Sequence, residues 1–257
     1  MKRYLLLLII VLCAVPVFAQ TVVLDGRSVT YKEIILIADG AKVEISKDAL
    51  QRVRDSHDTL INAAQSGHMI YGLTVGVGLN KDQQMVDATG RLSPEVIQAS
   101  REFNKGLIHA HCGGTGEKLD LRTTRAIMAV RLNNMLFGGS GVQEEVVVML
   151  QNMLNKGITP LFSSRGSIGE ADITILGHLG LAMIGEGEVL YKGKITKAAD
   201  ALKKEKLQTV ILFGKDALSI VSSNAYSAGM TVIAMGDMEQ LIKVAKLVYL
   251  SSLEAFN

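Results

Sequence analysis

Helical periodicity dominates the pattern of hydrophobic and polar positions along this chain. After an N-cap at Ser46, the apolar residues Leu50, Val53 and Leu60 fall on one stripe, which predicts a helix that ends at Gly67. Further helices are expected to begin near Ser93, cover 119–137 and 197–207, run from about 146 to 157, follow the loop at 166–172 as far as Gly185, and continue from Lys215 to the end of the chain. The pattern therefore predicts a mainly α fold.

A few short segments are typical of β-strands, and two of them lie close to the N-terminus. Residues 21–24 are β-prone, residues 42–45 alternate between polar and apolar side chains, and Thr30 can cap a short helix between them. Residues 188–196 contain a central Lys-Gly pair and predict a hairpin. We expect a small α/β N-terminal region that leads into helices.

The first nineteen residues have the pattern of a secretory signal peptide. Lys2 and Arg3 precede an unbroken apolar run over 5–18, and Ala19 is a small residue suited to cleavage. The run is shorter than the ~20 apolar residues of a spanning helix. We predict export to the periplasm, no stable membrane anchor after cleavage, and a folded domain over 20–257. An uncleaved anchor is the lesser alternative.

Composition limits the functions that the chain can have. Apolar residues make up 48% of the sequence, enough for a large core, and a net charge of +2 gives no reason to expect nucleic acid. Cys13 lies in the predicted signal peptide, so Cys112 remains alone and favours a packed side chain over a nucleophile. His109 and His111 are two residues apart and do not share a helical face, so no metal site is predicted.

Two glycine-rich loops are candidates for chemistry. Residues 166–178 run from a loop into an apolar helix, whose first N–H groups attract negative charge. Tyr71 heads a second loop over 70–78, and a tyrosine on a mobile loop can act as an acid or base. The alternatives are a tight turn that feeds a core helix and an aromatic ring packed under a loop. The residues alone leave both open.

Seven short motifs follow one another along the chain. They are Tyr71-Gly72 with Gly76 and Gly78, His111 before a glycine-rich turn, Leu132-Asn133 followed by Gly139-Ser140-Gly141, Gly166–Gly169, Asp172–His178, Gly185–Glu188 and Tyr191–Gly193. Each motif alone is weak. In this order and spacing, from about Gln20 to the last residue, they resemble the histidine and aromatic amino acid ammonia-lyase family.

The resemblance implies a mostly helical, fumarase/aspartase-like fold whose long central helices form the core of a homotetramer. The chain matches only the N-terminal half of that fold. In the family, an Ala-Ser-Gly triplet becomes a methylidene-imidazolone group that captures the amine of an amino acid substrate. By resemblance, Tyr71 would remove the β-proton, His111 would contact the substrate's side chain, and Asn133 would help to bind it.

The sequence departs from the family around this group. Counted back from Asp172, the triplet reads Gly169-Glu170-Ala171, and a glutamate cannot dehydrate to a methylidene. We therefore predict that no methylidene-imidazolone forms and that the chain needs no other cofactor. Thr74 and Val75 replace the family's Asn and Thr, and Ser222, which we include among the substrate-binding residues, replaces an asparagine that supports the electrophile.

Glu170 has two interpretations of equal weight. It can be a catalytic residue that binds a substrate ammonium or acts as a general base. It can also be a first-turn acid that only complements the helix dipole.

Two functions remain open at this point. One is an exported carbon–nitrogen lyase that acts on an amino acid or similar small acid. The other is a catalytically silent periplasmic binding or assembly protein on the same fold, which would explain the lost triplet.

Overall fold

The computed structural model describes residues 20–83, 85, 92–167, 169 and 171–256, so the predicted signal peptide and Glu170 lie outside it. Helices account for most of the described chain, as the periodicity predicts. The helices are α2 (Tyr31–Ala38), α3 (Lys47–Gln65), the 3-10 turn η1 (Gly78–Asn80), α4 (Pro94–Ala110), α5 (Leu121–Met135), α6 (Glu144–Lys156), α7 (Ile173–Met183), α8 (Ala198–Lys204), α9 (Asp216–Val221) and α10 (Ala225–Ala255). The strands are β1 (Thr21–Leu24), β2 (Lys42–Ile45), β3 (Thr115–Lys118), β4 (Ile158–Pro160), β5 (Ser163–Arg165), β6 (Glu188–Tyr191) and β7 (Lys194–Lys197).

The small α/β region forms at the N-terminal end as predicted. β1 and β2 pair in parallel, in a register that runs from Thr21 opposite Lys42 to Leu24 opposite Ile45, and α2 connects them. Thr30 begins α2 with a capping box, because its side chain accepts from the Glu33 N–H while the Glu33 carboxylate accepts from the Thr30 N–H.

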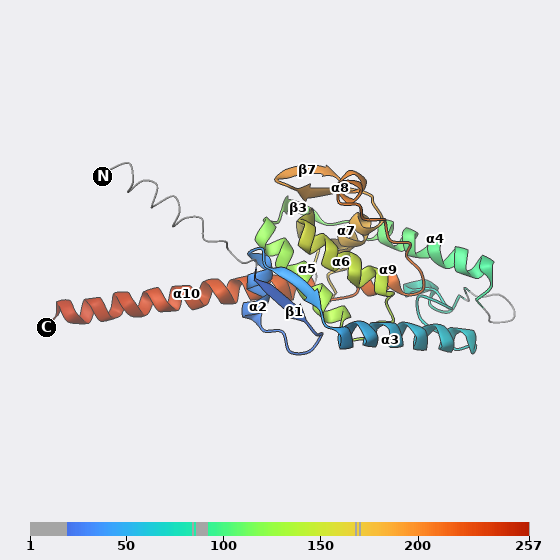
Figure 1. Ribbon diagram of the computed structural model, residues 1–257, viewed down its shortest axis with the longest axis horizontal. Coiled ribbons are helices and arrows are strands. Elements are labelled where there is room, and N and C mark those ends of the chain that lie inside the picture. The colour runs from blue at the N-terminus through green and yellow to red at the C-terminus, as the bar shows by residue number, and fades with distance from the viewer. Residues whose placement is uncertain (1–19, 84, 86–91, 168, 170, 257) are drawn as a thin grey trace, which may run out of the picture.

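Helix α5 lies at the centre of the helical layers (Figure 1). It is buried along the whole stretch 123–129 and packs against α10, α2 and α6. The buried Arg125 donates to the Ile37 and Leu154 carbonyls, both at 2.8 Å. One guanidinium therefore joins the end of α2 and the end of α6 to the central helix.

Helix α7 packs closely against α4 and α9 because it carries glycines at the contacts. A Cβ added at Gly180 would lie 2.3 Å from the Ile108 side chain of α4, and one added at Gly177 would lie 2.6 Å from the His111 carbonyl oxygen. Both distances are too short for any side chain. The glycines thus fix how closely α7 approaches α4.

Three short strands were not predicted from the sequence. β3 pairs antiparallel with β5, and β4 joins the predicted hairpin to give the sheet order β4-β6-β7. The residues of β3 are all exposed and β4 contains Pro160, so neither strand shows the alternation that marks a strand. Pairing with segments distant in sequence stabilises them.

The single helix predicted from Lys215 onward is in fact two helices. α9 ends at Val221, and α10 begins at Ala225. At the break, the Ser223 hydroxyl accepts a hydrogen bond from the Ala225 N–H at 3.1 Å. Serine side chains of this kind compete with the backbone carbonyls for N–H groups, and here that competition interrupts the helix although the apolar pattern continues.

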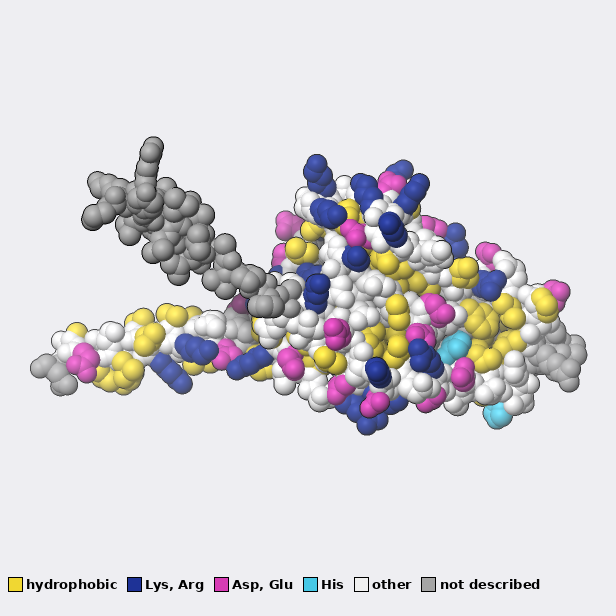
Figure 2. Space-filling model, in the orientation of Figure 1, with side chains coloured by type: hydrophobic (Ala, Val, Ile, Leu, Met, Phe, Trp, Pro, Cys, Tyr) yellow, Lys and Arg dark blue, Asp and Glu magenta, His cyan; other side chains and the backbone are white. Residues whose placement is uncertain are grey.

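Helix α10 leaves the body of the molecule after its first turns (Figure 1). Its N-terminal part packs on α5, where a Cβ at Gly229 would lie 2.7 Å from the Ile127 Cα. Beyond Glu239 its residues are exposed, including Leu247, Val248 and Leu250, and yellow side chains follow the projecting helix in Figure 2. None of the helices in the described residues has both the length and the apolar character that crossing a membrane requires.

Candidate functional site

The buried carboxylate of Asp172 organises the loop that precedes α7. Its oxygens accept hydrogen bonds from the Ser167 hydroxyl and from the Ser227 N–H and hydroxyl, the last two at 3.1 Å. The Asp172 N–H donates to the Ser223 carbonyl at 2.7 Å. These contacts join the loop at 166–171 to the break between α9 and α10. Glu170 belongs to this loop but lies outside the described residues.

Tyr71 lies on the loop at 70–78, which contacts α9. Its side chain is 45% exposed, and its hydroxyl oxygen accepts from the Gly78 N–H at 2.8 Å. Gly72 has a φ of +79°, and a Cβ there would lie 3.1 Å from the Leu218 side chain of α9. Because α9 also packs on α7, the Tyr71 loop and the Asp172 loop are held by one pair of helices.

Two hydrogen bonds of the Thr74 hydroxyl hold the shape of the Tyr71 loop. Its buried hydroxyl accepts from the Ile70 N–H at 2.7 Å and donates to the His68 carbonyl at 2.9 Å. Thr74 is one of the residues that replace the family's pattern here. In this chain it serves as an internal brace of the loop.

His111 ends α4 beside α7. Its Nδ1 lies 2.7 Å from the Leu107 carbonyl, which requires a proton on Nδ1 and leaves the lone pair of the neutral ring on Nε2. Its backbone touches Gly177 of α7. The half-buried ring is therefore oriented by α4 and placed next to the second turn of α7.

Asn133 and Asn134 face different parts of the molecule. The Asn133 Oδ1 accepts from the Gly26 N–H at 2.9 Å, so this side chain holds the loop after β1, and its substrate-binding role stays a prediction. The Asn134 Oδ1 accepts from Arg131 at 2.6 Å and lies 3.5 Å from the Ser223 hydroxyl. The sequence analysis selected Asn133, but Asn134 is the residue that reaches the break before α10.

Ser222 stands at the end of α9, where it is exposed, and its N–H donates to the Leu218 carbonyl at 2.9 Å. It is next to Ser223, the partner of Asp172. Ser222, Tyr71 and His111 thus come from three elements that contact α7 or α9. The structure places the Tyr71 loop against α9, the His111 backbone against α7 and Ser222 at the end of α9, and it directs the Asn133 side chain toward the loop after β1.

Burial lowers the pKa of two groups near this region. The Arg131 guanidinium is 3% exposed, and burial lowers its pKa to about 10. Burial, followed by the positive charge of Lys118, lowers the pKa of His178 on α7, whose buried Nε2 has no hydrogen-bond partner within the described residues. His178 is therefore neutral at pH 7. Among the described residues, no three His, Cys, Asp or Glu side chains gather closely enough to hold a metal ion.

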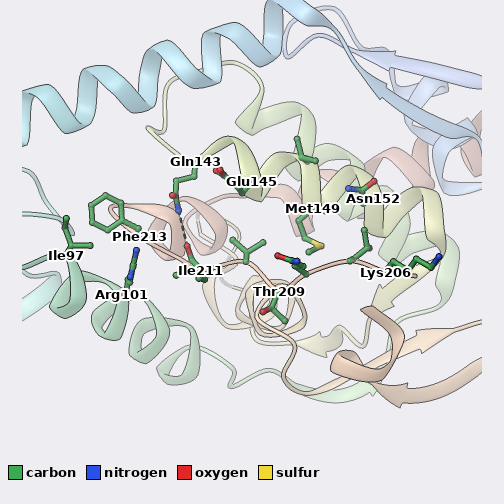
Figure 3. A pocket seen from close by; sticks show the side chains of 14 residues that line it. Ile97, Arg101, Gln143, Glu145, Met149, Asn152, Lys206, Thr209, Ile211 and Phe213 are labelled. Atoms are coloured by element: carbon green, nitrogen blue, oxygen red, sulfur yellow. Dashed lines mark hydrogen bonds between the residues drawn. The ribbon is translucent and has the colours of Figure 1, made fainter. Parts of the chain in front are cut away.

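A groove of about 630 Å³ lies elsewhere, between α4, α6 and the extended segment 206–213. Arg101, Met149 and Phe213 line it, and the Gln143 amide donates to the Ile211 carbonyl at 3.2 Å beside it (Figure 3). Of the predicted site residues that the structure describes, Tyr71, His111, Asn133 and Ser222, none lines this groove. We therefore do not assign the catalytic centre to this groove, despite its volume.

Comparison with known proteins gives a consistent result. Residues 29–257 match the family model described as aromatic amino acid lyase. A histidine ammonia-lyase from Treponema denticola is 36% identical over 241 residues, which cover 93% of this chain and 45% of that protein. A probable histidine ammonia-lyase from Thermoplasma acidophilum is 31% identical over 242 residues, which cover 91% and 46%. The chain thus spans less than half the length of the curated relatives it matches.

Solved structures show the same relationship. The crystal structure of the ergothioneine-degrading enzyme ergothionase from Treponema denticola, in complex with desmethyl-ergothioneine sulfonic acid, superposes with a TM-score of 0.80 and 36% identity. The match covers 87% of this chain and 43% of that one. Tyrosine aminomutase from Streptomyces globisporus superposes with a TM-score of 0.75 and 27% identity, covering 84% and 39%.

Proposed function

Because this chain belongs to the aromatic amino acid lyase family, we propose that the protein is a carbon–nitrogen lyase that eliminates a fully alkylated amine from a small aromatic amino acid betaine. The observation that carries this proposal is the glutamate at the centre of Gly169-Glu170-Ala171, in a chain 36% identical to an ergothioneine-degrading enzyme. We also propose that the protein is exported, on the pattern of its first nineteen residues.

The loop residues do not fit a methylidene-imidazolone. The centre of the triplet has no hydroxyl to lose as water, and the nearby Ser167 hydroxyl is bonded to Asp172 and accepts from the Gly169 N–H at 3.0 Å. Such an electrophile captures an amine through the nitrogen lone pair. The quaternary trimethylammonium group of a betaine has no lone pair to offer, and it leaves as a neutral amine once it takes the electron pair of the broken C–N bond. Ergothioneine, the trimethylated betaine of a thiol-bearing histidine, has this character.

The chain's own residues suit a direct elimination. Tyr71, as its phenolate and held by the Gly78 N–H, would take the proton from the β-carbon. The electrons of that C–H bond would form the double bond as the C–N bond breaks, and the neutral amine would leave with the C–N electron pair. His111, with its lone pair on Nε2, would accept a hydrogen bond from an N–H of the substrate's ring.

The test compares amines that differ in alkylation. The protein without its signal peptide, at its full natural length, is mixed separately with histidine, tyrosine, phenylalanine and ergothioneine. Ultraviolet absorbance then follows the unsaturated acid, and ammonia or trimethylamine release is measured in parallel. We expect turnover of ergothioneine alone. Turnover of the free amino acids would contradict the proposed loss of the electrophile.

A silent binding protein is the second candidate, and the lost triplet favours it as well. Ligand-induced thermal stabilisation without turnover of any of these compounds would support it. A Glu170→Gln variant separates the two roles of that residue, because unchanged turnover would limit Glu170 to the helix dipole.

A further inference from the structure

We propose that the β6–β7 hairpin and α8 form a surface that binds anionic phospholipid bilayers. Six lysines lie on this surface, and we call them the lysine face: Lys192, Lys194, Lys197, Lys203, Lys204 and Lys206. All six are exposed, and only three acids accompany them over residues 188–206. Figure 2 shows dark-blue side chains gathered over β7 and α8. A chain with a net charge of +2 thus concentrates positive charge on one small module.

The negative charge of Glu205, at the centre of this module, is offset by two lysines and a tyrosine hydroxyl. The Glu205 side chain is only 16% exposed and accepts from the Tyr191 hydroxyl. It also pairs with Lys192 at 3.2 Å and with Lys156 at 3.5 Å. Glu205 therefore contributes little negative potential to the lysine face, which stays strongly positive toward an approaching surface.

The lysine face contains a hollow with an apolar rim. Lys192, Lys194 and Lys204 line a cavity of about 560 Å³ together with the Thr196 hydroxyl. Ile195, which also lines it, is 61% exposed at the edge of the sheet β4-β6-β7. Lysines attract the phosphates of acidic lipids, and a protruding aliphatic side chain enters the boundary between headgroups and acyl chains. Both features occur here within one strand and one helix.

A bilayer fits these residues better than a nucleic acid does. Proteins that bind single strands stack bases on exposed aromatic rings. The only aromatic residue in 188–206 is Tyr191, which is 6% exposed and engaged with Glu205. The exposed apolar side chain of the module is the aliphatic Ile195, which suits lipid.

The expected strength follows from the charge. Each lysine near an acidic bilayer contributes roughly a fivefold gain in affinity, and the effect is screened within a distance of about 10 Å at 0.1 M salt. Removing two lysines should therefore weaken binding by about tenfold or more. Raising the salt concentration should weaken it further.

The test is vesicle sedimentation with the signal-free protein at its natural length. Vesicles of phosphatidylcholine alone are compared with vesicles that contain phosphatidylglycerol, at low and high salt. The variant Lys194→Gln/Lys204→Gln leaves the Glu205 cluster intact, and Ile195→Ser removes the apolar rim. The control Lys42→Gln/Lys47→Gln removes two exposed lysines near the start of α3.

We expect the wild type and the control to bind only the acidic vesicles, the double lysine variant to lose about tenfold in affinity, and Ile195→Ser to bind more weakly than the wild type. Equal binding to both vesicle types would assign adsorption to the exposed α10 and overturn the proposal. Absence of binding would overturn it too, and the lysines would then serve only to prevent the edge strand β7 from pairing with another chain. Preference for a single-stranded oligonucleotide over acidic vesicles would also contradict it. The test does not depend on the lyase activity, because no residue of the lysine face belongs to the predicted catalytic region.

Discussion

At the scale of single residues, the notable groups are two buried carboxylates, Asp172 and Asp216, that accept hydrogen bonds from uncharged donors. Asp172 is held by two serines, and Asp216 accepts from the Gln143 and Phe213 N–H groups, each at 2.9 Å, and from the Gln143 amide. Hydrogen bonds of this kind fix a carboxylate in one orientation. Each acid thereby joins segments of the chain that are far apart in sequence.

Tyr71 provides the most direct residue-scale prediction. Tyr71→Phe should lower turnover of the betaine by ~100-fold or more, because general base catalysis contributes roughly that much. The hydroxyl's only described contact is with the exposed Gly78 N–H, so the melting temperature should stay nearly unchanged. Steady-state kinetics and a thermal melt on the same sample check both parts. A variant with normal turnover would remove Tyr71 from the mechanism.

Asp216 gives the protein a pH dependence. Burial raises its pKa from 3.8 to about 6 against the opposing effect of its donors, so the folded protein holds this proton more tightly than the unfolded chain does. The associated stability is fully present below pH 3.8 and is lost as the pH rises through 6. We expect the wild type to lose about 2–3 kcal/mol between pH 4 and 7 relative to Asp216→Asn.

Urea unfolding at both pH values measures this difference, with the exposed Asp58→Asn as the control for removal of one carboxylate. A wild type that instead gains stability over Asp216→Asn as the pH rises would mean that the three donors outweigh burial.

At the scale of elements, glycine positions decide how the helices of the site pack. Gly177 meets the His111 carbonyl oxygen, whereas Gly106 in α4 has open space around it. Gly177→Ala should therefore destabilise the fold by about 1–3 kcal/mol, and Gly106→Ala should stabilise it by up to ~1 kcal/mol. Urea midpoints of the two variants provide the comparison. If Gly177→Ala were as stable as Gly106→Ala, α4 and α7 would not approach as closely as described.

Local patterns also explain which elements could be predicted from the sequence. The helix after Ser46 and the helix start at Thr30 depend on neighbours within one or two turns, and both were predicted. β3 and β5 depend on a partner distant in sequence, and no local pattern marks them. The break at Ser222–Asn224 follows from three good capping residues within an apolar stretch, a signal that the periodicity hid.

The candidate site was predictable only in part for a related reason. Tyr71 and His111 stand in recognisable motifs, and the structure places the Tyr71 loop beside α9 and His111 beside α7. The different directions of Asn133 and Asn134 depend on the rotation of α5, which the sequence does not fix to within one residue. The role of Asp172 depends on Ser223 and Ser227, which belong to the unpredicted break.

At the scale of the whole molecule, α10 presents an apolar face without a described neighbour. Leu241, Leu247 and Phe256 are among its exposed side chains, and exposed patches of this kind mark association surfaces. The family resemblance predicts that long central helices meet in a homotetramer. We accordingly expect the face to be covered by other copies of the protein.

Charge introduced on this face should oppose assembly. Leu247→Glu/Leu250→Glu should shift the protein to smaller species in sedimentation velocity, because unpaired charges are costly in an apolar interface. Lys42→Glu/Lys47→Glu, which places the same acids on β2 and at the start of α3, should leave the distribution unchanged. A wild type that stays monomeric at all concentrations would contradict the prediction.

The contact between Asp172 and the start of α10 also sets an order of events during synthesis. Ser227 follows Asp172 by 55 residues. At about 5–20 residues per second, the ribosome adds it roughly 3–11 seconds later. Until then Asp172 lacks its contacts with Ser223 and Ser227, even if every earlier helix is already formed. The region around the predicted catalytic residues is therefore one of the last parts of the described chain to acquire its shape. A nascent chain that stalls before Ser223 contains the earlier motifs but lacks the contacts that fix Asp172.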